Sequence, residues 1–131
     1  MMKILVGYDG SKPARKAIEL AVKYAKAFDA SVLVVTSLIG GTISDVDHKY
    51  HAEEEFEAIQ QLFKRENISC STDLLVRGLS PGEDITMYAE ENNVDLIFIG
   101  VKKKVKSMKL LFGSNAQYVT LNAHCPVVNV N

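Results

Sequence analysis

The sequence predicts an open α/β sheet of parallel strands with helices on both faces. Segments with helical periodicity alternate with short apolar runs, most of them rich in Val, Ile and Leu. This alternation is typical of parallel strands joined by right-handed crossovers. The first, second and fourth runs are nearly continuous rather than alternating, which indicates strands that are covered on both faces. The five runs lie at residues 3–9, 31–37, 70–76, 94–100 and 126–130.

The first helix is predicted directly after the first strand. Ser11 is a suitable N-cap, because its hydroxyl can accept a hydrogen bond from the first helical turn. The residues that follow carry an apolar stripe at the i, i+3, i+4 spacing of one helix face. This stripe consists of Ala14, Ala17, Ile18, Ala21, Val22, Ala25 and Phe28.

The other helices are marked by periodicity or by their N-termini. After the second strand, residues 38–48 are predicted to form an irregular surface loop, and a helix follows over about residues 47–65. Its inward face carries Phe56, Ile59 and Phe63. The segment SPGE, at 80–83, combines a capping serine, a proline at the first helical position and the glutamate of a capping box. A fourth helix is predicted to begin at Ser114 and to turn Ala116, Val119 and Ala123 inward.

Length and composition limit the possible classes of protein. A chain of 131 residues is long enough for one domain with one core, so residues 1–131 are expected to form a single domain. The formal net charge of −1 argues against a molecule built to coat nucleic acid or an anionic membrane. No apolar run approaches the roughly 18 residues of a membrane helix and no N-terminal signal is visible, so a cytoplasmic protein is expected. Cys70 and Cys125 are then expected to be reduced thiols.

Two strand ends carry polar or flexible residues suited to ligand binding. Asp9 follows the first strand, and Gly100 ends the fourth, where a lysine-rich loop begins. Ligands of doubly wound sheets bind beyond the carboxyl ends of the strands, where the strand order reverses. If the first and fourth strands are neighbours, Asp9, Gly100 and the loop line one crevice. The lysines of this loop are Lys102, Lys103, Lys104, Lys106 and Lys109.

The end of the lysine loop has the composition of a phosphate site. Gly113 and Ser114 precede the fourth helix, and the N-terminus of a helix offers unpaired N–H groups and a partial positive charge to an anion. A glycine there would let the backbone approach a ligand closely, and the serine hydroxyl could cap the helix or touch a phosphate. The same two residues also fit a simple turn with an N-cap, so the spacing alone leaves both interpretations open.

The chain resembles the universal stress proteins over essentially its whole length. The resemblance rests on the blocks KILVGYDGS, VLVVT, VDLIFIG and FGSNAQYVTLNAHCPVVNV, in this order and spacing. It implies an open doubly wound, Rossmann-like sheet of five parallel strands in the order 3-2-1-4-5. It also implies a homodimer paired through the last strand, here residues 126–130. Many members bind ATP through Gly-x2-Gly-x9-Gly-Ser/Thr, so ATP, alone or with Mg²⁺, is the implied ligand.

The family's binding motif matches this sequence only in part. Gly100 and the pair Gly113-Ser114 fit its ends, but Lys103 stands at the second glycine and Met108 at a position where a related subgroup has glycine. A lysine reaches positive φ only with strain, although its charge can hold a phosphate. The implied nucleotide-binding residues are Asp9, Ser37, Gly100, Lys102, Lys103, Gly113, Ser114 and Asn115, and Ser37 replaces an apolar residue beside adenine. The first hypothesis is therefore a nucleotide-binding regulatory module of the stress response, with no catalytic residue and at most very slow hydrolysis of ATP.

A second hypothesis needs no nucleotide. Because Lys103 and Ser37 depart from the family pattern, the chain could be a dimeric interaction module whose basic loop docks an acidic partner or an anion. Nucleic acid is not an expected partner, since only Phe112 adds an aromatic side chain to the loop. His48 and His51 share a helix face, but zinc sites usually need three or four converging ligands, so no metal site is predicted.

Overall fold

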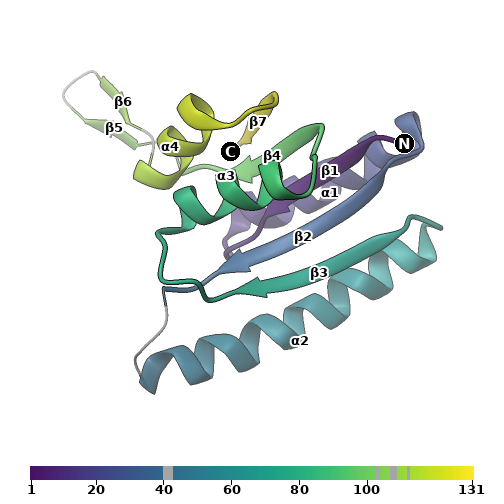
Figure 1. Ribbon diagram of the computed structural model, residues 1–131, viewed down its shortest axis with the longest axis horizontal. Coiled ribbons are helices and arrows are strands. Elements are labelled where there is room, and N and C mark those ends of the chain that lie inside the picture. Colours follow the sequence, from purple (N-terminus) through teal and green to yellow (C-terminus); the bar gives the residue numbers. More distant parts are fainter. Residues whose placement is uncertain (40–42, 103, 107–108, 112) are drawn as a thin grey trace.

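The main sheet has five parallel strands (Figure 1). The computed structural model describes residues 1–39, 43–102, 104–106, 109–111 and 113–131. The strands are β1 (Lys3–Gly7), β2 (Ser31–Ser37), β3 (Cys70–Leu75), β4 (Leu96–Gly100) and β7 (Val127–Val130). Their order across the sheet is β3-β2-β1-β4-β7, which confirms the expected order 3-2-1-4-5. The first and fourth strands of the sequence are therefore neighbours.

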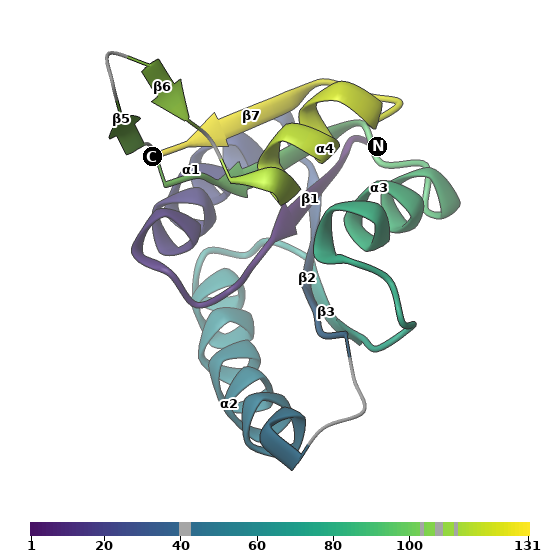
Figure 2. The same ribbon diagram turned by 90° about the vertical axis from the view of Figure 1, so that its left-hand side faces the viewer.

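Helices cover both faces of this sheet, as predicted (Figure 2). They are α1 (Lys12–Phe28), α2 (Ile43–Arg65), α3 (Pro81–Glu91) and α4 (Ser114–Asn122). Val6 and Val34 pack with α1 and α2, whereas Leu5 and Val35, one residue away on each strand, pack with α3 and α4. Because both sides of the central strands are buried, these strands read as continuous apolar runs.

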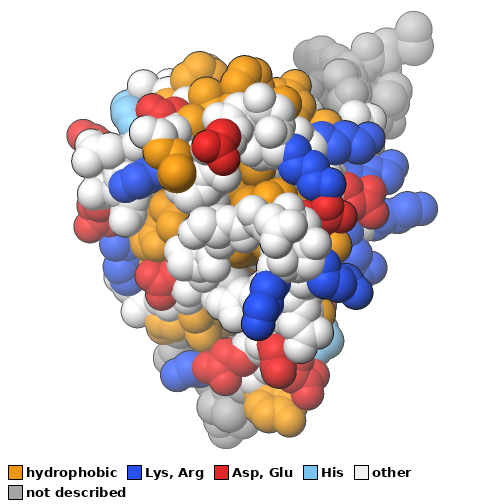
Figure 3. Space-filling view, turned by 90° about the vertical axis from the view of Figure 1, so that its right-hand side faces the viewer, with side chains coloured by type: hydrophobic (Ala, Val, Ile, Leu, Met, Phe, Trp, Pro, Cys, Tyr) orange, Lys and Arg blue, Asp and Glu red, His pale blue; other side chains and the backbone are white. Residues whose placement is uncertain are grey.

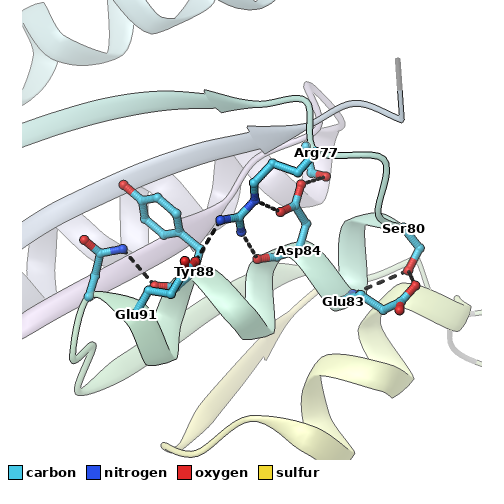
Figure 4. Close-up of polar contacts among 8 residues, drawn as sticks. Arg77, Ser80, Glu83, Asp84, Tyr88 and Glu91 are labelled. Carbon is cyan, nitrogen blue, oxygen red and sulfur yellow. Dashed lines mark hydrogen bonds and ion pairs between the residues drawn. The ribbon is translucent and has the colours of Figure 1, made fainter. Parts of the chain in front are cut away.

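The starts of the two helices that were predicted from capping residues are present. The Ser11 hydroxyl accepts a hydrogen bond of 3.2 Å from the Ala14 N–H at the start of α1. At the start of α3, the Ser80 hydroxyl accepts from the Glu83 N–H at 3.4 Å and donates to the Glu83 carboxylate at 2.7 Å (Figure 4). These contacts satisfy backbone donors that lack partners inside the helix. Both helices thus begin where the sequence placed them.

Two predictions about local structure were wrong, and one element was not predicted. The helix α2 begins at Ile43, inside the segment 38–48 that was predicted as irregular. The prediction missed this start because four residues, 43–46, are too few to show a helical period of apolar residues. Part of the lysine-rich loop forms an antiparallel hairpin of β5 (Lys104–Lys106) and β6 (Lys109–Leu111), whose three-residue strands are too short to show a pattern. Phe28, predicted on the apolar stripe of α1, is 56% exposed because it lies in the last turn, beyond the sheet.

One end of the molecule shows charges of both signs. Figure 3 shows the end of the molecule at which the strands begin, where basic and acidic side chains are interspersed. Cys70 and Cys125 are free thiols and half-buried. Among the described residues, no helix has the length and apolar character needed to cross a membrane.

Candidate functional site

A crevice lies at the carboxyl ends of β1, β2 and β4, and it encloses about 300 Å³. The sheet order reverses here, since β2 lies on one side of β1 and β4 on the other. This is the position at which doubly wound folds bind ligands. Seven of the eight predicted site residues line the crevice: Asp9, Ser37, Gly100, Lys102, Gly113, Ser114 and Asn115. Lys103 lies outside the described residues.

Asp9 stands at the mouth of the crevice, directly after β1. One of its carboxylate oxygens accepts a hydrogen bond of 2.9 Å from the Ser11 N–H, which fixes the side chain against the start of α1. Gly10 makes the turn between them with a φ of 80°, a conformation that favours glycine. The Asp9 side chain is exposed, and its second oxygen has no hydrogen-bond partner among the described residues. That oxygen can therefore accept hydrogen bonds from a ligand hydroxyl.

Gly100 has a packing role that sequence reasoning did not foresee. A Cβ at this position would lie 2.5 Å from the backbone nitrogen of Ala14 and 2.7 Å from the carbonyl carbon of Pro13. The end of β4 and the first turn of α1 are therefore in direct backbone contact, which only glycine permits.

The N-terminus of α4 forms the side of the crevice beyond β4. Gly113 is its N-cap and supplies no side-chain hydrogen bond, and the first turn of α4 contains no acidic residue. The helix begins at Ser114, as predicted, and because Gly113 is the N-cap, the Ser114 hydroxyl does not cap it. Its exposed hydroxyl makes no hydrogen bond to any described residue. The first N–H groups of α4 are thus without a side-chain cap, and helix ends of this kind attract anions.

Gly113 itself is not required by the fold. Its φ is −62°, which any residue can adopt, and a Cβ would meet no atom within 4 Å. Asn115, in contrast, is held in place: its side-chain oxygen accepts a hydrogen bond of 2.9 Å from the Gly82 N–H at the start of α3. Asn115 also lines the crevice, and since its oxygen is engaged, its amide N–H groups are the donors that remain for other partners.

At the β2 end of the crevice, Ser37 contacts a buried polar network that sequence reasoning missed. The Ser37 hydroxyl donates a hydrogen bond of 2.6 Å to Asp84, whose side chain is fully buried on α3. The Arg77 Nε donates to the other Asp84 oxygen at 2.6 Å, and Arg77 Nη1 forms an ion pair of 2.7 Å with Glu91 (Figure 4). Hydrogen bonds to Glu91 and then to Asp84 raise the pKa of Arg77. The sequence does contain one signal for this network: Asp84 stands beside Ile85 on the inward face of a predicted helix, where a buried carboxylate needs partners.

The comparisons with known proteins agree on one family. The model of the universal stress protein family matches residues 1–131. The chain belongs to the universal stress protein family. A universal stress protein of Methanocaldococcus jannaschii is 30% identical over 139 residues, which cover 98% of this chain and 81% of that protein. The curated relatives are named as stress proteins.

Solved structures of universal stress proteins share the fold. One from Archaeoglobus fulgidus is 30% identical, with a TM-score of 0.85, over 100% of this chain and 94% of that one. A structure of the universal stress protein from the same organism in complex with dAMP has a TM-score of 0.81 and 30% identity, over 100% of this chain and 98% of that one.

A second cavity of about 330 Å³ adjoins the crevice of this universal stress protein, with Tyr8, Asp9 and Ser37 in the common wall. Its outer wall includes His51, whose Nε2 lies 3.1 Å from a carboxylate oxygen of Glu55. Burial and the neighbouring Glu55 raise the pKa of Tyr8, although Arg15 opposes the shift. Within the described part of the chain, no three His, Cys, Asp or Glu side chains converge as metal ligands would.

Proposed function

We propose that this universal stress protein is a regulatory module that binds an adenine nucleotide in the crevice. The observation that carries this proposal is the N-terminus of α4, which lacks a side-chain cap and opens into a cavity at the switch point of the sheet. The complex of the Archaeoglobus fulgidus protein with dAMP supports it, because that protein is 30% identical over the whole chain. The family match over residues 1–131 supports treating them as one domain.

The proposed ligand lies across the sheet from α4 to β2. Its phosphates lie against the N–H groups of Gly113, Ser114 and Asn115, with Gly100 opposite and Lys102 and Lys103 supplying positive charge. Asp9 accepts hydrogen bonds from the ribose hydroxyls. The base lies beside Ser37, where Val35 and Ile85 provide apolar walls. ATP, alone or with Mg²⁺, is the proposed physiological nucleotide.

We assign this site to binding rather than to catalysis. Among the described residues that line the crevice, Asp9 is the only one with a carboxylate, and none is a histidine or a cysteine. Ser11 occupies one oxygen of Asp9, and in the proposed pose the other oxygen accepts from the ribose, away from the phosphates. A general base must come within hydrogen-bond reach of the water that it activates. Any hydrolysis of ATP is therefore expected to be very slow.

Isothermal titration with AMP and with Mg-ATP tests the proposal. The matched variant is Gly113→Val, whose side chain points into open space and should leave the thermal unfolding temperature little changed. The bulk of valine should block the approach of phosphate to α4 and lower the affinity at least tenfold. If the wild-type protein gives no heat at millimolar nucleotide, the proposal fails. It also fails if Gly113→Val binds as tightly as the wild type.

A non-nucleotide interaction module is the second candidate. The hairpin β5–β6 favours it, because this ribbon carries lysines at positions 104, 106 and 109 and forms a sheet separate from the main one. A basic ribbon of this kind can dock an acidic partner or an anion. Gly113→Val separates the two functions, since it should leave binding through the hairpin intact while it weakens nucleotide binding.

The proposed assembly is a homodimer paired through residues 126–130. The strand β7 is at the edge of the main sheet, next to β4 only, and all four of its residues are half-buried. An edge strand presents unpaired N–H and C=O groups that can pair with another chain. Pairing β7 with its copy would satisfy these groups and cover the exposed parts of its valines.

A further inference from the structure

The side chain of Ser37 faces the crevice on the α3 side of the sheet. Successive side chains of a strand point to opposite faces, so Ser37 shares its face with Val35 and Leu33. Both of these pack with α3 and α4. The hydrogen bond from Ser37 to Asp84 on α3 agrees with this orientation. Ser37 is half-buried, and it lines the crevice.

The network behind Ser37 determines the direction of its hydrogen bond. Asp84 has no exposed surface, and its two oxygens accept from Arg77 Nε and from the Ser37 hydroxyl, both at 2.6 Å. A carboxylate in an ion pair with a guanidinium only accepts hydrogen bonds. Ser37 must therefore donate its single hydroxyl proton to Asp84. A buried charge that lost this partner would be costly, which keeps the proton in place.

Toward a ligand in the crevice, the Ser37 hydroxyl can therefore accept a hydrogen bond but cannot donate one. A hydroxyl oxygen that donates its proton in one direction retains lone pairs that accept from another. The strands β2 and β4 lie two positions apart, or roughly 10 Å at the usual strand spacing. A nucleoside can bridge this span, and Ser37 lines the same crevice as Ser114 and Asn115 at the start of α4, so a ligand whose phosphate rests on α4 can reach Ser37 with its base.

We propose that Ser37 is a specificity-determining residue that accepts a hydrogen bond from the exocyclic amino group of the base, and that Asp84 is the positioning residue that makes it an acceptor. The inference rests on the proposed function, because it concerns the base of the nucleotide placed there. In an adenine nucleotide the 6-amino group supplies the only N–H donors of the base. The pair Ser37–Asp84 thus selects a 6-aminopurine over a purine with hydrogen or a carbonyl oxygen at position 6.

The first test compares AMP with purine riboside 5′-monophosphate, which differs only in lacking the amino group. Isothermal titration of the wild-type protein should give about tenfold weaker binding of the purine riboside nucleotide, the size expected for one hydrogen bond. Ser37→Ala should bind the two nucleotides equally. Equal affinities in the wild-type protein would overturn the inference while leaving the proposed function intact. If neither nucleotide binds to the wild type, both fail.

The second test reverses the direction of the hydrogen bond. In Asp84→Asn, Arg77 Nε still needs an acceptor, so the amide oxygen faces Arg77 and the amide nitrogen faces Ser37. Ser37 then accepts from Asn at position 84 and is free to donate into the crevice. The ratio of AMP to IMP affinity, measured in the same variant, should fall about tenfold or more below its wild-type value, because IMP carries a carbonyl oxygen at position 6. A general loss of stability would weaken both ligands alike, so an unchanged ratio would overturn the role of Asp84.

Discussion

Gly100 lies against Ala14 so closely that a Cβ on the glycine would come within 2.5 Å of the Ala14 backbone nitrogen. This contact joins the end of β4 to the first turn of α1 beside the crevice. Gly100→Ala should therefore push α1 away and destabilise the fold by about 1–3 kcal/mol, the usual cost of overpacking. Chemical denaturation measures this loss.

The matched control for that substitution is Gly113→Ser. The position is open and has a φ of −62°, and serine is a good N-cap, so the stability of this variant should be equal to that of the wild type or slightly higher. If Gly100→Ala is as stable as Gly113→Ser, the end of β4 does not need a glycine for packing.

Arg77 balances the buried charge of Asp84. Arg77→Met should cost about 1–3 kcal/mol of folding stability, because it leaves one oxygen of a fully buried carboxylate without its partner. Lys26→Met is a suitable comparison, since it removes the partner of Glu66 in an exposed ion pair and should cost less than about 1 kcal/mol. Urea titrations of both variants give the difference. If Arg77→Met and Lys26→Met lose similar amounts of folding stability, the burial of Asp84 does not determine how much the Arg77–Asp84 ion pair contributes.

The Cys70 thiol should react slowly at neutral pH. Burial raises its pKa to about 11, so the thiolate fraction at pH 8 is about a hundredfold below that of an ordinary cysteine. The rate of alkylation by iodoacetamide, followed by mass spectrometry at each cysteine, should rise about tenfold per pH unit up to that pKa. Cys125, whose pKa is raised by burial and by Asp95, supplies an internal comparison. A rate that levels off near pH 9 would contradict the shift.

The raised pKa of Cys70 also makes the folding stability fall as the pH rises above 9. Because the folded state binds the Cys70 proton more tightly than the unfolded chain, the contribution of this group is fully present below its ordinary pKa of 9.0. It decreases as the pH rises from there toward 11. Cys70→Ser should therefore make the stability less dependent on pH in this alkaline window, which thermal unfolding at several pH values can measure.

The proposed dimer predicts a clear effect at β7. Val128→Asp places a charge on the edge strand and should convert the protein to a monomer in sedimentation experiments. Val76→Asp is the control, because Val76 is 49% exposed just beyond β3, at the opposite edge of the sheet. It should leave the association unchanged. Persistence of the dimer in a folded Val128→Asp variant would exclude β7 as the interface.

Sequence reasoning was most successful where a signal is local. The apolar runs, the caps at Ser11 and Ser80 and the clustering of polar residues at strand ends are each visible in a few neighbouring residues. Adjacency of the first and fourth strands then brought Asp9 and Gly100 together. The early start of α2 left no such signal, because residues 43–46 are too few to show a helical period.

The alternation of strands and helices can be read from the chain alone, and the family resemblance pointed to seven residues that line one crevice. What several of them do there depends on contacts between distant parts of the chain. Gly100 contacts a helix that is distant in sequence, and Ser37 donates its proton to Asp84, 47 residues further along the chain. The physical reason is that the direction of a hydrogen bond and the space beside a backbone depend on groups that folding brings together, whereas hydrophobic periodicity and helix capping depend on near neighbours in the chain.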